Sequence, residues 1–177
     1  AYMAGIFSLP AGTAILSTGV LPVINLLGVY ACQSLFRVVK DETRASLYLF
    51  LASALCALIL CFLGGTHISL PLLAFALITA CMMGVNLMLV SFVPTHFSRM
   101  GMTSFLSGLT NSMVYLGSGL SSFGFGLAIE SAGWNIFPIL LVALAFSGAL
   151  FCFLAAPGWF SFVQRERMAN NHATGKS

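Results

Sequence analysis

Small and hydroxyl-bearing side chains gather in the stretch from Val93 to Gly126, VPTHFSRMGMTSFLSGLTNSMVYLGSGLSSFGFG. Three kinds of chemistry use such a stretch. Glycine backbone N–H groups can cradle a phosphate, a serine between glycines can act as a nucleophile, or small residues can let two helices pack closely. Each predicts a different class of protein, so the elements that carry these residues must decide.

Neither phosphate binding nor nucleophilic catalysis fits the spacing. After Gly117 and Gly119 a dinucleotide fingerprint needs glycine at position 122, where Ser122 stands, and the sequence contains no GK[ST] phosphate loop. Ser118 in LGSG would need a general base within hydrogen-bond reach. No histidine or acidic residue lies near the middle of any apolar stretch, which is where Ser118 lies in its own. We therefore expect no catalytic residue, and a protein that is not an enzyme.

The composition is that of a membrane protein. Hydrophobic residues make up 59% of the 177 residues and charged residues 6%, whereas a soluble domain carries about 25% charged residues. No Asp, Glu, Lys or Arg occurs from Ala45 to Ser98, from Met100 to Ile129 or from Ser131 to Gln164. Since a bilayer span needs about 20 apolar residues, the first gap holds two spans and each of the others holds one.

Charges and helix breakers together predict an all-α integral membrane protein with five transmembrane helices in a domain from 13 to 163. The predicted spans are Thr13 to Phe36, Ser46 to Leu63, Leu70 to Val93, Met102 to Ile129, and Asn135 to Phe162. Residues 1–12 are expected to be the end of a preceding helix or an extracytoplasmic loop. Residues 164–177 are expected to form a short, polar, disordered cytoplasmic tail.

The basic residues predict the orientation. With five spans, the loop from Arg37 to Arg44, the loop at Arg99 and the tail share one side, and all seven Lys and Arg residues lie there. The connections GGTHIS and IESAGW contain none, so the positive-inside rule assigns the basic side to the cytoplasm. The C-terminus is then cytoplasmic, in a multi-pass protein of the plasma (inner) membrane. A nucleic-acid partner would need a clustered basic face, which this sequence lacks.

The cysteines and histidines predict no metal site and no cofactor. All five cysteines fall inside apolar stretches, without a CxxC pair and without a histidine at ligand spacing, so we interpret them as small apolar core residues. His67 and His96 lie at span ends, where we expect hydrogen-bonded loop residues. Glu130 is expected to be a solvated interface group.

The segment LPVINLLGVY, Leu21 to Tyr30, followed by Phe36-Arg37 and by Lys40 to Arg44, resembles the eighth helix and following cytoplasmic loop of major facilitator superfamily transporters. In that family the loop typically follows a glycine, a few residues, an acidic residue and then basic residues. Here Gly28 matches the glycine, and Gln33 stands at the acidic position. The small-residue helix that follows VPTHFSRMG is similar to the branch containing organophosphate:phosphate antiporters and anion:cation symporters.

The resemblance implies that the chain forms helices eight to twelve of that fold, most of one six-helix half, with the end of helix seven before them. It also implies a secondary transporter of a small solute, with the N-terminal six-helix half and the bilayer as partners. The substrate would bind near the bilayer midplane between the halves. The loop residues Arg37, Lys40, Asp41 and Arg44 would then belong to a cytoplasmic gating loop.

Polar residues inside the spans are the candidates for a substrate path. Thr18, Asn25 and Gln33 share one face of the first span, and Asn25 either lines a cavity or hydrogen-bonds a neighbouring helix. Asn86 lies in the third span. Asn111 and Tyr115 share a polar face of the fourth and are the leading candidates for substrate contact.

The small residues of the fourth span favour helix packing over phosphate or acyl chemistry. The predicted packing residues are Gly108, Ser112, Ser118, Ser122 and Gly126. Two other functions stay open beside transport: a non-transporting membrane scaffold and, less favoured, a membrane-embedded enzyme.

Overall fold

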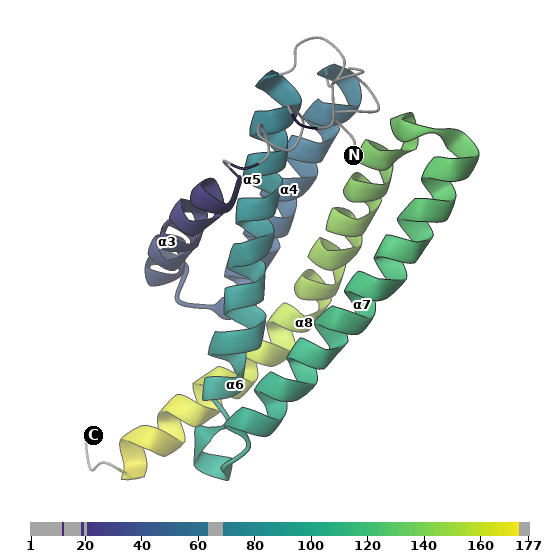
Figure 1. Ribbon diagram of the computed structural model, residues 1–177. Helices are drawn as coiled ribbons and strands as arrows, with labels where there is room; N and C mark the ends of the chain where they lie inside the picture. The colour runs from purple at the N-terminus through teal and green to yellow at the C-terminus, as the bar shows by residue number, and fades with distance from the viewer. Residues whose placement is uncertain (1–11, 13–18, 20, 64–68, 174–177) are drawn as a thin grey trace.

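The computed structural model describes residues 12, 19, 21–63 and 69–173 (Figure 1). Every regular element among these residues is helical. The long α-helices are α3 (Leu21–Val39), α4 (Glu42–Leu63), α5 (Ser69–Asn86), α7 (Thr103–Ala132) and α8 (Phe137–Ala173). Shorter elements join them: the π-helix η1 (Leu87–Phe92), α6 (Val93–Thr95) and the 3₁₀ turns η2 (Ser98–Met100) and η3 (Trp134–Ile136).

Five helices in the described part of the chain are long and apolar enough to cross a membrane. These segments are Pro22–Val39, Glu42–Phe62, Ser69–Thr95, Thr103–Ala132 and Trp134–Glu166. The prediction of an all-helical chain with five candidate spans is confirmed. Within the described residues the first span begins at Pro22. Its predicted beginning, Thr13, and the expectation for residues 1–12 concern positions that, apart from residue 12, lie outside the described residues.

Two predicted helix ends were wrong. The helix α8 continues to Ala173, so residues 164–173 are helical and the expected disordered tail does not begin at 164. The helix α4 begins at Glu42 rather than Ser46, because the Arg44 backbone N–H donates to Asp41 Oδ1 at 2.9 Å and so caps the helix one turn earlier. Lys40, with φ 53°, occupies the left-handed conformation that ends α3.

Small residues hold α3, α4, α5 and α8 together. A Cβ added to Gly28 of α3 would lie 2.5 Å from the Ala80 Cβ of α5, and one on Gly84 would meet Cys32 and Leu49. A Cβ on Gly148 of α8 would meet the Phe50 ring of α4. Such close approach replaces the hydrophobic driving force that is missing between helices in lipid. The buried core is correspondingly rich in alanine, at positions 45, 54, 57, 74, 76, 80, 145 and 149.

The third span changes its helical type near its end. The Val93 N–H bonds to the Met88 carbonyl, five residues back, in the π-helical stretch that precedes the buried Pro94. Proline has no N–H to donate to the Val90 carbonyl in an α-helical pattern. The Ser107 hydroxyl of α7 donates to that carbonyl at 3.1 Å. A side chain from the next helix thus takes the place of the missing backbone donor.

The helix α7 lies along the outer edge of the structure (Figure 1). Its described contacts are near its ends, where Ser107 meets η1 and the Phe125 ring packs edge-on against Phe137 with centroids 5.7 Å apart. No residue of α7 is buried, and all residues from 111 to 120 are exposed. The helix is therefore joined to the bundle at both ends and is open along its middle.

Candidate functional site

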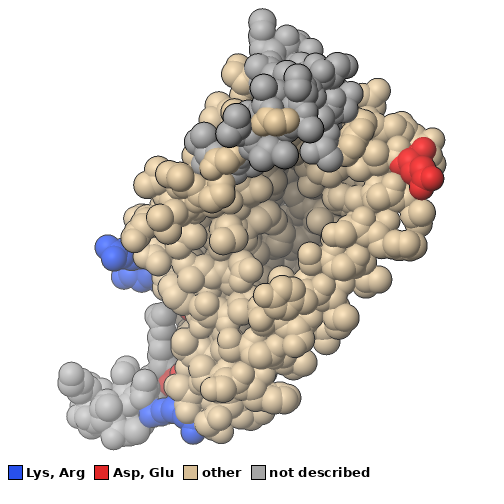
Figure 2. All heavy atoms as spheres, viewed as in Figure 1, with Lys and Arg blue, Asp and Glu red and all other residues tan. Residues whose placement is uncertain are grey.

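Three segments that are distant in sequence meet at one end of the bundle, which we call the basic end. They are the junction of α3 and α4, the segment 96–102, and the last turns of α8. In the view of Figure 2 the Lys and Arg side chains lie along the lower and left parts of the surface, and the upper part shows none among the described residues. The prediction that these segments share one end is confirmed by their hydrogen bonds. The side of the membrane on which they lie stays a prediction.

A clasp of four side chains, His96, Glu42, Glu166 and Trp159, ties the basic end together. His96 Nε2 lies 3.0 Å from Glu42 Oε1, and His96 Nδ1 lies 2.5 Å from Glu166 Oε2. The Trp159 indole N–H donates to Glu42 Oε2 at 3.1 Å, and its ring packs edge-on against the imidazole. The segment after α6 is thereby joined to both α4 and α8.

The geometry of the clasp favours a protonated histidine. Only the imidazolium carries an N–H on both ring nitrogens, and each nitrogen here faces a carboxylate oxygen. Burial by itself lowers the pKa of His96, but hydrogen bonds to Glu42 and Glu166 and their negative charges outweigh it. The pKa of His96 is therefore raised above its ordinary value of 6.5.

The residues of the predicted gating loop differ in their exposure. Asp41 is buried and caps α4, whereas Arg44 places its guanidinium over the Phe160 ring at 5.1 Å. Arg37 and Lys40 are exposed. Glu42, which was not predicted as a site residue, is 5% exposed and makes hydrogen-bond contacts with two side chains from other segments, His96 and Trp159. The sequence did contain one indication that Glu42 matters: it is one of only four acidic residues in the chain, and it lies directly after the aspartate that caps α4.

The polar residues predicted for the first and third spans lie in different settings. Thr79 Oγ1 of α5 donates to Asn25 Oδ1 at 2.7 Å, which is the interhelical hydrogen bond considered as the alternative to a cavity. Gln33 is half-buried and Asn86 is exposed. Thr18 lies outside the described residues. A substrate-path role for these positions stays a prediction.

Asn111 and Tyr115 lie on the open middle of α7, where Tyr115 is 70% exposed. Among the described residues neither side chain has a hydrogen-bond partner. The neighbouring packing candidates are also open: a Cβ on Gly108 or Gly126 would meet nothing within 4 Å. Ser112, Ser118 and Ser122 are exposed as well. The packing prediction therefore stays a prediction about a surface that the described chain does not cover.

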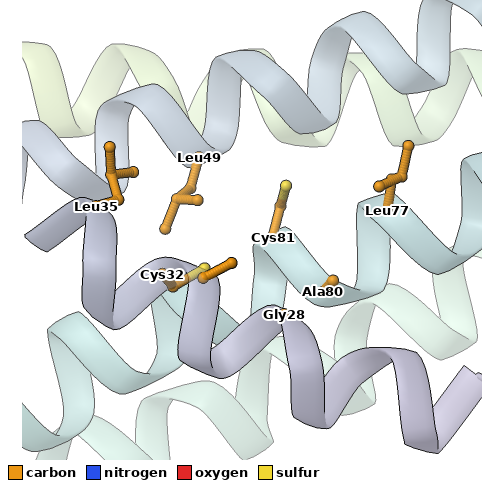
Figure 3. A pocket seen from close by; sticks show the side chains of 8 residues that line it. Gly28, Cys32, Leu35, Leu49, Leu77, Ala80 and Cys81 are labelled. Carbon is orange, nitrogen blue, oxygen red and sulfur yellow. The ribbon is translucent and has the colours of Figure 1, made fainter.

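A cavity of about 260 Å³ lies between α3, α4 and α5 (Figure 3). Its lining consists of Gly28, Ala31, Cys32, Leu35, Leu49, Leu77, Ala80 and Cys81. No polar anchor lines it, so it can hold an apolar chain but cannot orient a polar substrate. The cysteines are free thiols, and no metal-binding cluster occurs in the described part of the chain.

No protein-family model, no curated protein and no solved structure matches this chain. Its class therefore follows from its own features. It is an all-helical protein with five helices, in the described part, long and apolar enough to span a membrane.

Proposed function

We propose that this chain is part of a secondary transporter that moves a small solute by alternating access. In this proposal its five spans form most of the C-terminal half of a major facilitator superfamily fold. A six-helix N-terminal half completes the cavity, and the basic end faces the cytoplasm across a plasma (inner) membrane. No cofactor and no nucleic acid takes part.

The observation that carries the proposal is the open polar middle of α7. The Ser112 and Ser121 hydroxyls are satisfied within the helix, donating to the Gly108 and Ser118 carbonyls. The amide of Asn111 and the phenol of Tyr115 have no such partner in the described chain. Placing an unpaired polar group in the hydrocarbon core costs roughly several kcal/mol of free energy. Such groups therefore face water or another polypeptide. A solute cavity beside α7 meets this requirement.

The clasp supports the proposal in a second way. Alternating access moves one helical unit against another around a central site, which requires each unit to move as a body. Glu42, His96 and Glu166 join α4, the segment after α6 and α8 at one end. The exposed Arg37 and Lys40 at that end are then available to contact the other half as a gate.

Two other functions are distinguishable from transport. A membrane scaffold would cover the α7 surface with protein in all states. A membrane-embedded enzyme would need a base near Ser118, and within the described chain no histidine, aspartate or glutamate contacts that side chain. The proposal therefore depends on water reaching Asn111 and Tyr115.

The test is water accessibility of single cysteines in the complete membrane-embedded protein. The five native cysteines are replaced, and Asn111→Cys, Tyr115→Cys and Leu116→Cys are each treated with a membrane-impermeant maleimide. Leu116 is the control, because it lies at the same depth on another face of α7 and is 62% exposed. We expect labelling at 111 and 115 and not at 116. Protection of all three positions would favour the scaffold and overturn the proposed cavity.

A further inference from the structure

We infer that a groove between α4 and α8 at the basic end binds one anionic glycerophospholipid from the adjoining leaflet. The groove has a volume of about 540 Å³. Arg44, Leu47 and Tyr48 line it from α4, at the spacing of a single helical face. The α8 side is also one face, formed by Phe153, Ala156, Pro157, Phe160 and Ser161.

The groove is positively charged at one end and apolar along its length. Arg44 is the only charged residue that lines it among those described, and its side chain is 53% exposed. The acid nearest to it, Asp41, pairs with Nε at 3.9 Å, beyond hydrogen-bond distance, and Asp41 itself lines a separate cavity with Lys40 and Glu42. The two Nη amino groups of Arg44 therefore remain as charged donors that can bind a phosphate bidentately.

The arrangement along the membrane normal fits a lipid. Arg44 lies in the first turn of α4, and Trp159 of α8 lies at the same end. Aromatic and basic side chains of this kind occupy the headgroup level. Phe153 lies eight residues before Ser161 on α8, or about 12 Å deeper along the helix. A lipid whose phosphate binds Arg44 would thus place an acyl chain along the groove, in contact with Phe160, Leu47 and Phe153.

The lining favours a lipid over a free anion and an anionic lipid over a zwitterionic one. Five of the eight lining residues, namely Leu47, Phe153, Ala156, Pro157 and Phe160, are apolar, and a free phosphate would gain nothing from them. A zwitterionic headgroup brings its own cation, and none of the described lining residues is a carboxylate that could receive it. The hydroxyls of Tyr48 and Ser161 suit a polar headgroup such as glycerol.

Native mass spectrometry of the full purified chain in detergent tests this inference. Phosphatidylglycerol and phosphatidylcholine are added separately, and the fraction of chain carrying one retained lipid is measured. We expect preferential retention of phosphatidylglycerol, reduced about fivefold by Arg44→Gln, since a basic residue at the surface contributes about 1 kcal/mol. Arg37→Gln is the matched control, because Arg37 is exposed at the same end and does not line the groove. It should retain the lipid as the original chain does.

A second variant tests the apolar length of the groove without changing charge. Ala156→Phe fills the groove and should lower retention while thermal unfolding shows a folded chain. Equal retention of the two lipids, or unchanged retention in both Arg44→Gln and Ala156→Phe, would overturn the inference. Displacement of the lipid by millimolar inorganic phosphate in an Arg44-dependent manner would assign the site to a free anion and would overturn it too. If Arg44→Gln fails to fold, unchanged retention in Ala156→Phe alone is sufficient to reject it.

Discussion

At the scale of single residues, three of the four acidic side chains in the sequence lie at the basic end, and two of them converge on one histidine. The sequence predicted His96 to be a hydrogen-bonded loop residue, and that is confirmed. Its partners could not be predicted, because Glu42 and Glu166 lie 54 and 70 residues away in the chain. Local patterns do not report which span ends meet.

The clasp predicts a pH dependence of stability with a defined sign. Because the pKa of His96 is raised in the folded state, its contribution is complete below the unfolded value of about 6.5. It is lost as the pH rises through the higher folded pKa. We expect the thermal unfolding midpoint in detergent to fall over this window, because the hydrogen bonds to a charged imidazolium are lost.

The variant His96→Gln should abolish this dependence. Trp159→Phe is the control, since it keeps the ring packing, removes only the indole donor to Glu42, and should keep the pH dependence. A midpoint that changes with pH equally in His96→Gln and in the original chain would show that the clasp does not titrate as described.

At the scale of helices, close packing is found at glycines outside the serine-rich stretch. Gly28, Gly84 and Gly148 each lie against a neighbouring helix, whereas Gly108 and Gly126 of α7 face open space. The sequence indicated that small residues would pack, but many glycines in the chain meet that description equally well. Which glycine faces a partner depends on helix rotation and tilt, which only packing sets.

Adding one methyl group distinguishes these two kinds of glycine. Gly28→Ala places a Cβ 2.5 Å from the Ala80 Cβ and 3.1 Å from its Cα, and neither atom can rotate away. We expect a loss of about 1–3 kcal/mol from overpacking. Gly126→Ala should be neutral to slightly stabilising in the isolated chain, because helix propensity improves. Equal unfolding midpoints for the two variants would contradict the described α3–α5 contact.

The π-helical stretch predicts a coupling between Pro94 and Ser107. Ser107→Ala leaves the Val90 carbonyl without its hydroxyl donor and should cost about 1 kcal/mol. In a Pro94→Ala background the restored backbone N–H can serve that carbonyl, so the same change should cost less. A double-mutant cycle by thermal unfolding measures the difference, and additive effects would show that the two donors are independent.

At the scale of the whole molecule, five spans place the two ends of α7 on opposite sides of a membrane. The helix has 30 residues and is therefore about 45 Å long, with Ser98 just before it and Glu130 near its far end. In a chain with its native cysteines replaced, Ser98→Cys and Glu130→Cys should react with an impermeant maleimide from opposite sides in oriented vesicles. We expect Ser98→Cys on the cytoplasmic side, and reaction of both from one side would exclude five spans.

The sequence by itself determined the helical class, the number of candidate spans and the shared end of the charged segments. Those follow from hydropathy and charge, which act on each segment separately. Only the tertiary structure decided that α4 starts at Asp41's cap, that Asn25 bonds Thr79, and that His96 joins Glu42 to Glu166. The same holds for the open middle of α7. These features depend on which helix faces meet. A helix that is apolar on all sides has no hydrophobic face to direct its packing, so the van der Waals fit between distant segments determines which faces are in contact.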